Sequence, residues 1–252
     1  MREFLSVENI NLTYQSLQGE TSAIGDVSFS VKKGLFVSIV GPSGCGKSTL
    51  LSCIAGLTKP TGGKIFLEGK EINGVSPQIG YMLQTDNLFP WRSIYKNVLL
   101  GLEIQKKLTE ENIAYVNQLL KKYGLWDFKD SYPAALSGGM RQRAALIRTL
   151  AVRPSLLLLD EAFSALDYQT RVTVSRDVYN ILRSENQTMI MVTHDIPEAI
   201  SMSDKIIVLS KRPATVSLML DTPFPKQRDT MAVRTSTEYG KCYETVWKEM
   251  NQ

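Results

Sequence analysis

The sequence predicts an α/β fold built on a mainly parallel sheet, and three observations indicate it. Short apolar runs of strand length alternate with helical segments in the first and last parts of the chain. Residues 85–155, in contrast, have a mostly helical pattern. A glycine-rich segment, residues 41–49, follows one strand and precedes a helix. Because strands separated by helices favour parallel pairing, we expect a single domain, 1–252, with a core lobe of residues 1–84 and 156–252 and a helical lobe, 85–155, inserted between its strands.

The first part of the chain carries four strand-like runs separated by turn signals. Lys33-Gly34 and Asn73-Gly74 are two of these signals, because glycine adopts the backbone angles that tight turns need. The expected strands span residues 27–31, 35–40, 64–67 and 79–83. The second of them leads directly into the glycine-rich segment.

That segment reads GPSGCGKST and fits the pattern G-x-x-x-x-G-K-[ST]. Its glycines let backbone N–H groups turn toward phosphate oxygens, and the positive end of the following helix dipole points to the same place. Lys47 adds a full charge for β- and γ-phosphates, and the Ser48 hydroxyl can ligate Mg²⁺. The predicted cradle comprises Gly41, Pro42, Ser43, Gly44, Cys45, Gly46, Lys47, Ser48 and Thr49. The alternative, a glycine-rich turn that binds nothing, does not explain a lysine at the helix start.

Helices are expected in the middle of the chain, where apolar residues recur at helical spacing over 94–102 and 113–120. Ser137, Gly138 and Gly139 then precede another helical run. A serine with two glycines at a helix start makes a second anion-binding N-terminus, with a simple N-cap turn as the alternative.

Two acids end the apolar run Leu156–Leu159, which is typical of a buried parallel strand. Ligands bind at the carboxyl ends of strands in open parallel sheets. Asp160 is therefore expected to hold Mg²⁺, directly or through water, and Glu161 to polarise the water that attacks a γ-phosphate. The alternative is an ordinary strand end with exposed acids.

Two further strands are expected at residues 189–193 and 205–209. His194, the only histidine, ends the first of them and is followed by Asp195. A neutral imidazole there could bond a γ-phosphate or the attacking water, although a lone histidine can also be purely structural. The last segment places four residues on one helical face that we expect to pack on the domain: Tyr239, Cys242, Val246 and Met250.

Composition narrows the classes of protein. A hydrophobic content of 43% and a charged content of 21% are ordinary for a globular protein. The net charge of +4 is compatible with an anionic membrane surface, nucleic acid or a solvated surface, and the scattered basic residues favour the last. Three cysteines without metal-ligand spacing indicate reduced thiols. No stretch reaches the roughly 18 apolar residues of a membrane span, and the first residues have no signal-peptide core, so we expect any membrane connection to run through a partner.

The phosphate loop, LSGGM (136–140), LLLLDE (156–161), Ser164–Asp167 and His194 resemble, in order and spacing, the nucleotide-binding subunits of ABC transporters. The resemblance covers nearly the whole chain. It implies a P-loop NTPase fold, with a RecA-like core, an antiparallel β part near the N-terminus and the inserted helical lobe. It also implies ATP hydrolysis with ATP and Mg²⁺ as cofactors.

The same resemblance implies roles for further residues. Tyr14 would stack on adenine, and Gln84 would contact Mg²⁺ and the attacking water while linking the two lobes. Ser137, Gly138 and Gly139 would bind the γ-phosphate held by a second protomer, in a head-to-tail homodimer with two ATP molecules between protomers. Asp167 would lie at that dimer interface. The implied metal ligands are Ser48, Gln84 and Asp160, and the implied catalytic residues are Glu161, His194, Gln84 and Lys47.

Some positions depart from the family pattern, and others suggest a subgroup. Many members have glutamine at Met140, and importers usually have proline and glycine at Ala162 and Ser164; we expect neither departure to remove function. Residues 85–98 (TDNLFPWRSIYKNV) and 209–214 (LSKRPA) resemble the importers of nitrate, sulfonate and taurine, a group that also takes up thiamine-precursor pyrimidines. The alternative is the ATPase subunit of an exporter whose membrane subunit is encoded separately.

The resemblance also implies partners. We expect a peripheral protein on the cytoplasmic face of the cell membrane, bound to integral permease subunits and indirectly to an extracytoplasmic substrate-binding protein, with no nucleic acid. Leu88, Phe89, Pro90 and Trp91 follow Gln84 and are expected to receive a permease helix if they are exposed. The alternative is that they form the core of the helical lobe.

Overall fold

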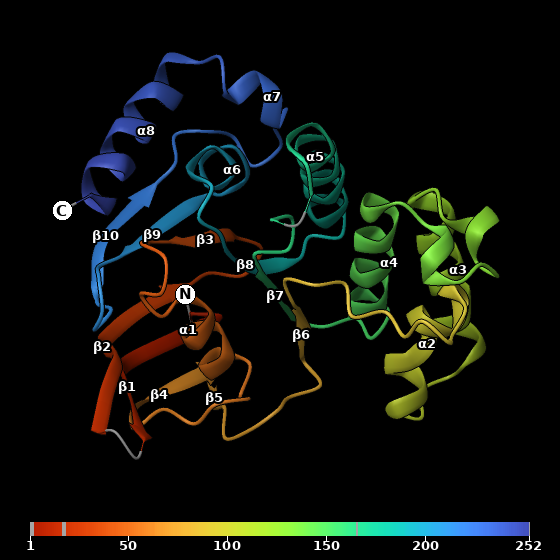
Figure 1. Ribbon diagram of the computed structural model, residues 1–252, viewed down its shortest axis with the longest axis horizontal. Helices are drawn as coiled ribbons and strands as arrows, with labels where there is room; N and C mark the ends of the chain where they lie inside the picture. Colours follow the sequence, from red (N-terminus) through yellow and green to blue (C-terminus); the bar gives the residue numbers. More distant parts are fainter. Residues whose placement is uncertain (1–2, 17–18, 165, 252) are drawn as a thin grey trace. The chain divides into compact units, whose positions relative to one another are not determined.

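The computed structural model describes residues 3–16, 19–164 and 166–251 (Figure 1). The chain divides into two compact units. The first unit joins Met1–Ser76 to Tyr179–Gln252, and the second is Pro77–Val178. Among the described residues, no helix is long and apolar enough to cross a membrane.

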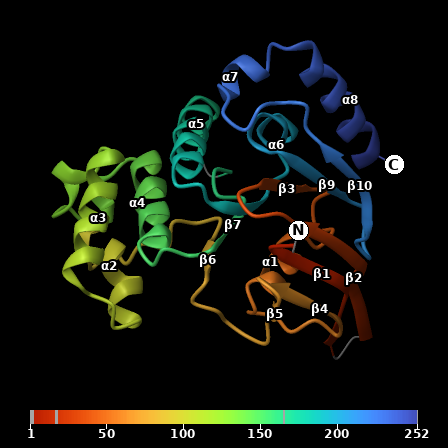
Figure 2. The same cartoon turned by 180° about the vertical axis from the view of Figure 1, so that it is seen from behind.

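An antiparallel sheet occupies the N-terminal part of the first unit, as predicted. Its strands are β1 (Leu5–Ser16), β2 (Gly19–Val31), β4 (Gly62–Leu67) and β5 (Lys70–Glu71), in the order β2-β1-β4-β5 (Figure 2). The β1–β2 register shifts near Asn9, whose φ of 50° lies in the left-handed region. Such a bulge breaks the alternation of inward and outward side chains along β1.

The parallel strands of the first unit surround β3 (Phe36–Val40). It runs parallel to β8 (Thr188–Val192) on one side and to β9 (Lys205–Leu209) on the other. Every residue of β3 and β8 is buried, which is why both are mainly apolar rather than alternating. The exceptions are Ser38 inside β3 and Thr188 at the start of β8. The edge strand β10 (Val216–Asp221) is antiparallel to β9, and the Arg212–Pro213 peptide bond between these two strands is cis.

Helices cover this part of the first unit. They are α1 (Lys47–Ile54), α6 (Ile196–Met202), α7 (Thr230–Val233) and α8 (Thr237–Met250). Cys242 and Val246 of α8 are buried in one cluster with residues of β3, α6 and β9, and Tyr239 and Met250 pack against that cluster. The face predicted for the last segment is therefore the face that packs on the domain.

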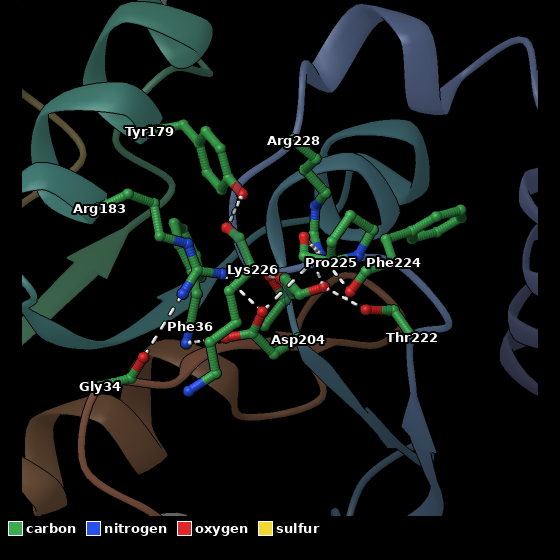
Figure 3. A network of polar contacts seen from close by, with 12 residues as sticks. Gly34, Phe36, Tyr179, Arg183, Asp204, Thr222, Phe224, Pro225, Lys226 and Arg228 are labelled. Atoms are coloured by element: carbon green, nitrogen blue, oxygen red, sulfur yellow. Dashed lines mark hydrogen bonds and ion pairs between the residues drawn. The ribbon is translucent and has the colours of Figure 1, made fainter.

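A polar network around Asp204 joins distant segments of the first unit (Figure 3). The Asp204 carboxylate accepts the Phe36 backbone N–H at 2.9 Å and the Arg183 guanidinium at 2.6 Å. Arg228, almost fully buried, lies 3.7 Å from the same carboxylate. The Tyr179 hydroxyl donates to a backbone carbonyl of the segment before α7 at 2.7 Å. Arg228 also donates to the backbone carbonyls of Ser201, Ser203, Phe224 and Pro225.

The second unit combines two parallel strands with helices. Strand β6 (Ile79–Met82) pairs in parallel with β7 (Leu156–Asp160). The helices are α2 (Ile94–Ile104), α3 (Glu110–Lys122), α4 (Gly138–Leu150) and α5 (Tyr168–Ser184), with short 3₁₀ turns η1 (Trp126–Phe128) and η2 (Pro133–Ala135). Helix α5 begins in this unit and ends in the first.

Side chains on α4 hold the segment that follows β6. The Arg141 guanidinium pairs with the Asp86 carboxylate at 3.0 Å. Arg148 donates to the backbone carbonyls of Asp86 and Asn87, each at 2.6 Å. These bonds fix the backbone directly before the apolar segment that begins at Leu88.

Candidate nucleotide site

The phosphate loop, residues 41–46, connects β3 to α1 as predicted. Gly44 and Gly46 have φ values of +72° and +121°, which side chains rarely adopt. A Cβ at Gly41 would lie 2.8 Å from the carbonyl oxygen of Leu209, closer than real contacts permit. Glycine is therefore needed at Gly44 and Gly46 for the backbone angles, and at Gly41 because the neighbouring strand β9 approaches closely.

Lys47 begins α1 and closes the loop. Its side chain is only 5% exposed, and its ammonium donates to the carbonyl oxygens of Gly41 and Pro42, each at 2.9 Å. Ser43, Gly44 and Ser48, in contrast, are exposed to solvent. Backbone N–H groups at a helix start form an anion site, and here the loop carbonyls of Gly41 and Pro42 are bound to Lys47.

Other predicted residues of the first unit lie on separate elements. Tyr14 is on β1 with 47% of its surface exposed, as a stacking residue requires. His194 is exposed directly after β8, while its neighbour Asp195 caps α6 by accepting the Glu198 N–H at 2.9 Å. Cys45 is buried and free of disulfide bonding, and Thr49 is half-buried on α1.

In the second unit, Asp160 ends β7 with its side chain directed into the protein. It is 8% exposed and accepts a hydrogen bond from the Tyr81 hydroxyl at 3.0 Å. The alternative of an exposed acid is thus wrong for Asp160. Glu161 follows with a φ of +46°, a left-handed conformation that is costly for a residue with a side chain and that clusters at functional sites.

Gln84 and Glu161 come together, although 77 positions separate them. The Gln84 amide lies 3.5 Å from the Glu161 carboxylate and donates to the Ser164 hydroxyl at 3.1 Å. That hydroxyl donates in turn to the Glu161 carbonyl at 2.9 Å. The sequence places Ser164 in the Ser164–Asp167 segment and shows it as a departure from the importer pattern, but predicts no role for it in the site, and it does not single out Tyr81. Each holds a predicted site residue in place.

The remaining predicted residues lie at the start of α4 and before α5. The Ser137 hydroxyl caps α4 by accepting the Met140 N–H at 3.3 Å, and a Cβ at Gly139 would lie 3.1 Å from Val174 of α5. Asp167 accepts the Thr170 N–H at 3.1 Å, and hydrogen bonds from Thr170 lower the pKa of its carboxyl. Ala165 lies outside the described residues.

A shallow depression of about 340 Å³ opens between the starts of α4 and α5. It is lined by Ser137, Gly139, Arg143, Gln169, Thr170, Thr173, Val174 and Asp177. Gly138 lies beside it at the first position of α4. The Ser137 cap, the two glycines and the depression together leave the N-terminus of α4 accessible to an external anion. Ser137 can therefore cap the helix while the same helix end binds an anion, so the two alternatives are compatible.

The chain resembles known proteins over most of its length. Residues 24–164 match the family described as ABC transporter. The chain is 49% identical over 251 residues to a Bacillus subtilis (strain 168) protein described as an uncharacterized ABC transporter ATP-binding protein, YtlC, covering 98% of this chain and 96% of the relative. It is 37% identical over 243 residues to the nitrate import ATP-binding protein NrtC of Synechococcus elongatus, covering 95% of this chain but 37% of that protein.

Among solved structures, a dimeric post-hydrolysis state of the ATP-binding cassette MJ0796 bound to ADP and Pi aligns with a TM-score of 0.74 and 31% identity. The alignment covers 86% of this chain and 98% of that one.

Proposed function

Because the chain belongs to the ABC transporter family of ATP-hydrolysing subunits, we propose that it powers import through a membrane permease, with residues 41–49 holding the phosphates of ATP. The observation that carries the site assignment is the buried Lys47 ammonium, which turns two loop carbonyls toward itself at the start of α1. Tyr14 would stack on adenine, and its exposed ring on β1 supports that role.

Glu161 is the proposed general base, polarising the water that attacks the γ-phosphate. The contacts from Gln84 to Glu161 and Ser164 support this role, because they limit the positions that the carboxylate can take. Gln84 would report the γ-phosphate to the rest of the second unit. His194, exposed at the end of β8, would bond the γ-phosphate or the water.

The residues proposed for Mg²⁺ offer a fitting donor set. Ser48 supplies a hydroxyl, Gln84 an amide oxygen and Asp160 a carboxylate, and Mg²⁺ takes hard oxygen ligands together with substrate phosphates. The Tyr81 hydroxyl, 3.0 Å from Asp160, orients that carboxylate. When bound, Mg²⁺ neutralises charge on the phosphates. Within the second unit, the protein's own contribution is to hold the Asp160 carboxylate in a defined direction.

A head-to-tail homodimer is the proposed working form. Ser137, Gly138 and Gly139 would bind the γ-phosphate of ATP on the second protomer, and Asp167 would lie at the interface. The depression beside the N-terminus of α4 supports this, because it leaves room there for a phosphate group from outside the chain. The dimeric state of the solved relative supports it as well.

We further propose a peripheral location on the cytoplasmic face of the membrane, with permease subunits as direct partners and a substrate-binding protein as an indirect one. The exposed pair Phe89 and Trp91 supports permease contact: their rings stack at 5.0 Å, and Trp91 is 71% exposed. Pro90 is also exposed, whereas Leu88 is buried and belongs to the core of the second unit. The docking segment is therefore residues 89–91 rather than all four apolar residues.

The proposed cargo is a small anion of the nitrate, sulfonate or taurine type, or a thiamine-precursor pyrimidine. The likeness to a nitrate import subunit supports the first class. Export with a separately encoded membrane subunit is the alternative. Uptake of labelled anions by vesicles containing the permease and the binding protein would separate the two, since an exporter accumulates nothing from the binding-protein side.

Glu161→Gln tests the catalytic assignment. The variant should bind ATP normally but hydrolyse it about 10²–10⁴-fold more slowly, because the general base is lost. It should also accumulate as an ATP-bound dimer on size exclusion. Turnover near the parent rate would remove Glu161 from the chemistry, and a monomer at saturating ATP would contradict the sandwich dimer.

A further inference from the structure

The loop between β9 and β10 lies against the phosphate loop. This β9–β10 turn, residues 210–215, belongs to the LSKRPA segment (209–214), to which the proposed function gives no role. The turn is closed on itself. The Ser210 N–H donates to the Thr215 carbonyl, and the Thr215 N–H donates to the Ser210 hydroxyl, each at 3.0 Å.

Strand β2 anchors the far end of the turn. The Ala214 N–H donates to the Ala23 carbonyl at 3.1 Å, and the Gly25 N–H donates to the Ala214 carbonyl at 2.8 Å. Pro213 lies so close to Gly25 that a Cβ there would be 3.4 Å away. With both ends hydrogen-bonded, the turn is a fixed platform rather than a loose loop.

The platform lies beside the last glycine of the phosphate loop, and Leu209, the residue directly before the platform, lies beside the first. A Cβ at Gly41 would lie 2.8 Å from the Leu209 carbonyl oxygen. A Cβ at Gly46 would lie 3.8 Å from the Ala214 side chain. Both ends of the phosphate loop therefore lie close to the connection between β9 and β10.

Arg212 makes the central contact. Its guanidinium donates to the Gly44 carbonyl oxygen at 2.9 Å. In the same peptide group, the Cys45 N–H donates to the Pro42 carbonyl at 3.3 Å. Because both polar ends of this peptide are bonded, its plane has a defined orientation.

Two cations bind three carbonyl oxygens of the phosphate loop. Lys47 takes those of Gly41 and Pro42 from within, and Arg212 takes that of Gly44 from the platform. A carbonyl turned toward bound phosphates would repel them, whereas N–H groups attract them. Holding carbonyls away from the phosphates is therefore part of building the site.

We propose that Arg212 is a positioning residue for the phosphate loop, holding the Gly44 carbonyl away from the β- and γ-phosphates of ATP. This inference rests on the proposed assignment of residues 41–49 as the phosphate site. Lys211 has the same charge one position earlier and provides a matched control. Its loss changes the charge of the turn without removing the bond to Gly44.

The test compares Arg212→Gln, Arg212→Lys and Lys211→Gln by calorimetric titration with ATP, ADP and AMP. Arg212→Gln should weaken ATP and ADP binding by about tenfold, the scale of a hydrogen bond from a charged donor. AMP has no β- or γ-phosphate, so its affinity should change less than about twofold. The ATP affinity of Arg212→Lys should lie between those of Arg212→Gln and the parent. The ATP affinity of Lys211→Gln should equal that of the parent.

Chemical rescue separates the missing bond from general damage. Added guanidinium ion, at about 50 mM and far below denaturing concentrations, should recover ATP affinity in Arg212→Ala but not change it in the parent. Thermal unfolding of each variant should show an intact fold.

Two results would overturn the inference. One is ATP affinity within twofold of the parent in Arg212→Gln, and the other is AMP binding weakened as much as ATP binding. A parent protein that binds ATP no better than AMP would instead overturn the assignment of the phosphate loop itself, and this inference with it.

Discussion

Replacing Lys47 by methionine separates nucleotide binding from fold stability. Methionine keeps the length of the side chain but removes the ammonium, whose surroundings are almost dry at 5% exposure. A hydrogen bond to a charged group contributes about 1.5–3 kcal/mol. Losing one such bond to the phosphates should therefore raise the Kd for ATP about 10- to 150-fold.

The effect on stability should be small because two terms oppose each other. The variant loses the bonds to the carbonyls of Gly41 and Pro42, which destabilises the fold. It also no longer buries a charge, which stabilises it. We expect the free energy of unfolding to change by less than about 1 kcal/mol, since both terms are of similar size.

Calorimetric titration with ATP and urea unfolding measure the two quantities on the same preparation. Lys64→Met is the matched control, because the Lys64 side chain is 60% exposed and paired with Glu71, and surface pairs contribute little. Its ATP affinity should match that of the parent. A folded Lys47→Met protein with ATP affinity within twofold of the parent would refute the reasoning.

Three other predictions address separate parts of the molecule. Tyr14→Ala should weaken ATP binding by roughly 1–3 kcal/mol, the scale of base–aromatic stacking, with the hydrolysis rate of bound ATP unchanged; equal affinity by titration would remove Tyr14 from the site. Trp91→Ser should reduce permease assembly and uncouple hydrolysis from transport, while ATP binding by the isolated subunit survives; an unfolded variant would instead indicate a core role. Burial raises the pKa of Cys53 from 9.0 to about 11, so the stability that this neutral thiol contributes is complete below pH 9 and is lost as pH rises toward 11. In urea unfolding, the free energy of unfolding of Cys53→Ala should therefore fall less steeply between pH 9 and 11 than that of the parent. If the two proteins lose stability in parallel over that range, the raised pKa of Cys53 is contradicted.

Several elements were predictable because one local signal was enough. The runs that form β3, β7 and β8 are buried on both faces, so apolar residues dominate each of them and turn or polar residues bound them. The phosphate loop was equally clear, because its glycines and Lys47 have fixed spacing. Each of these sequence patterns spans about ten residues or fewer, so it can be recognised without knowing the fold.

Other elements were missed for physical reasons. The bulge near Asn9 interrupts the alternation along β1. In the edge strand β10 burial alternates, but the exposed face carries Met219, so the sequence V-S-L-M-L-D does not show that alternation clearly. The contacts of Ser164 with Gln84 and of Arg212 with Gly44 join positions 80 and 168 residues apart. Only tertiary structure brings such pairs together.

The place of β3 has a consequence for synthesis on the ribosome. Both of its neighbours, β8 and β9, come from the last quarter of the chain, and so does the Asp204 carboxylate that binds its first N–H. At about 5–20 residues per second, the roughly 150 residues between β3 and β8 take about 7–30 s to emerge. During that interval a mostly apolar strand, ending in the loop assigned to ATP, has no partner on either side. The nascent chain therefore exposes an aggregation-prone edge until translation is nearly complete, and its yield in cells should depend on chaperones that shield this strand.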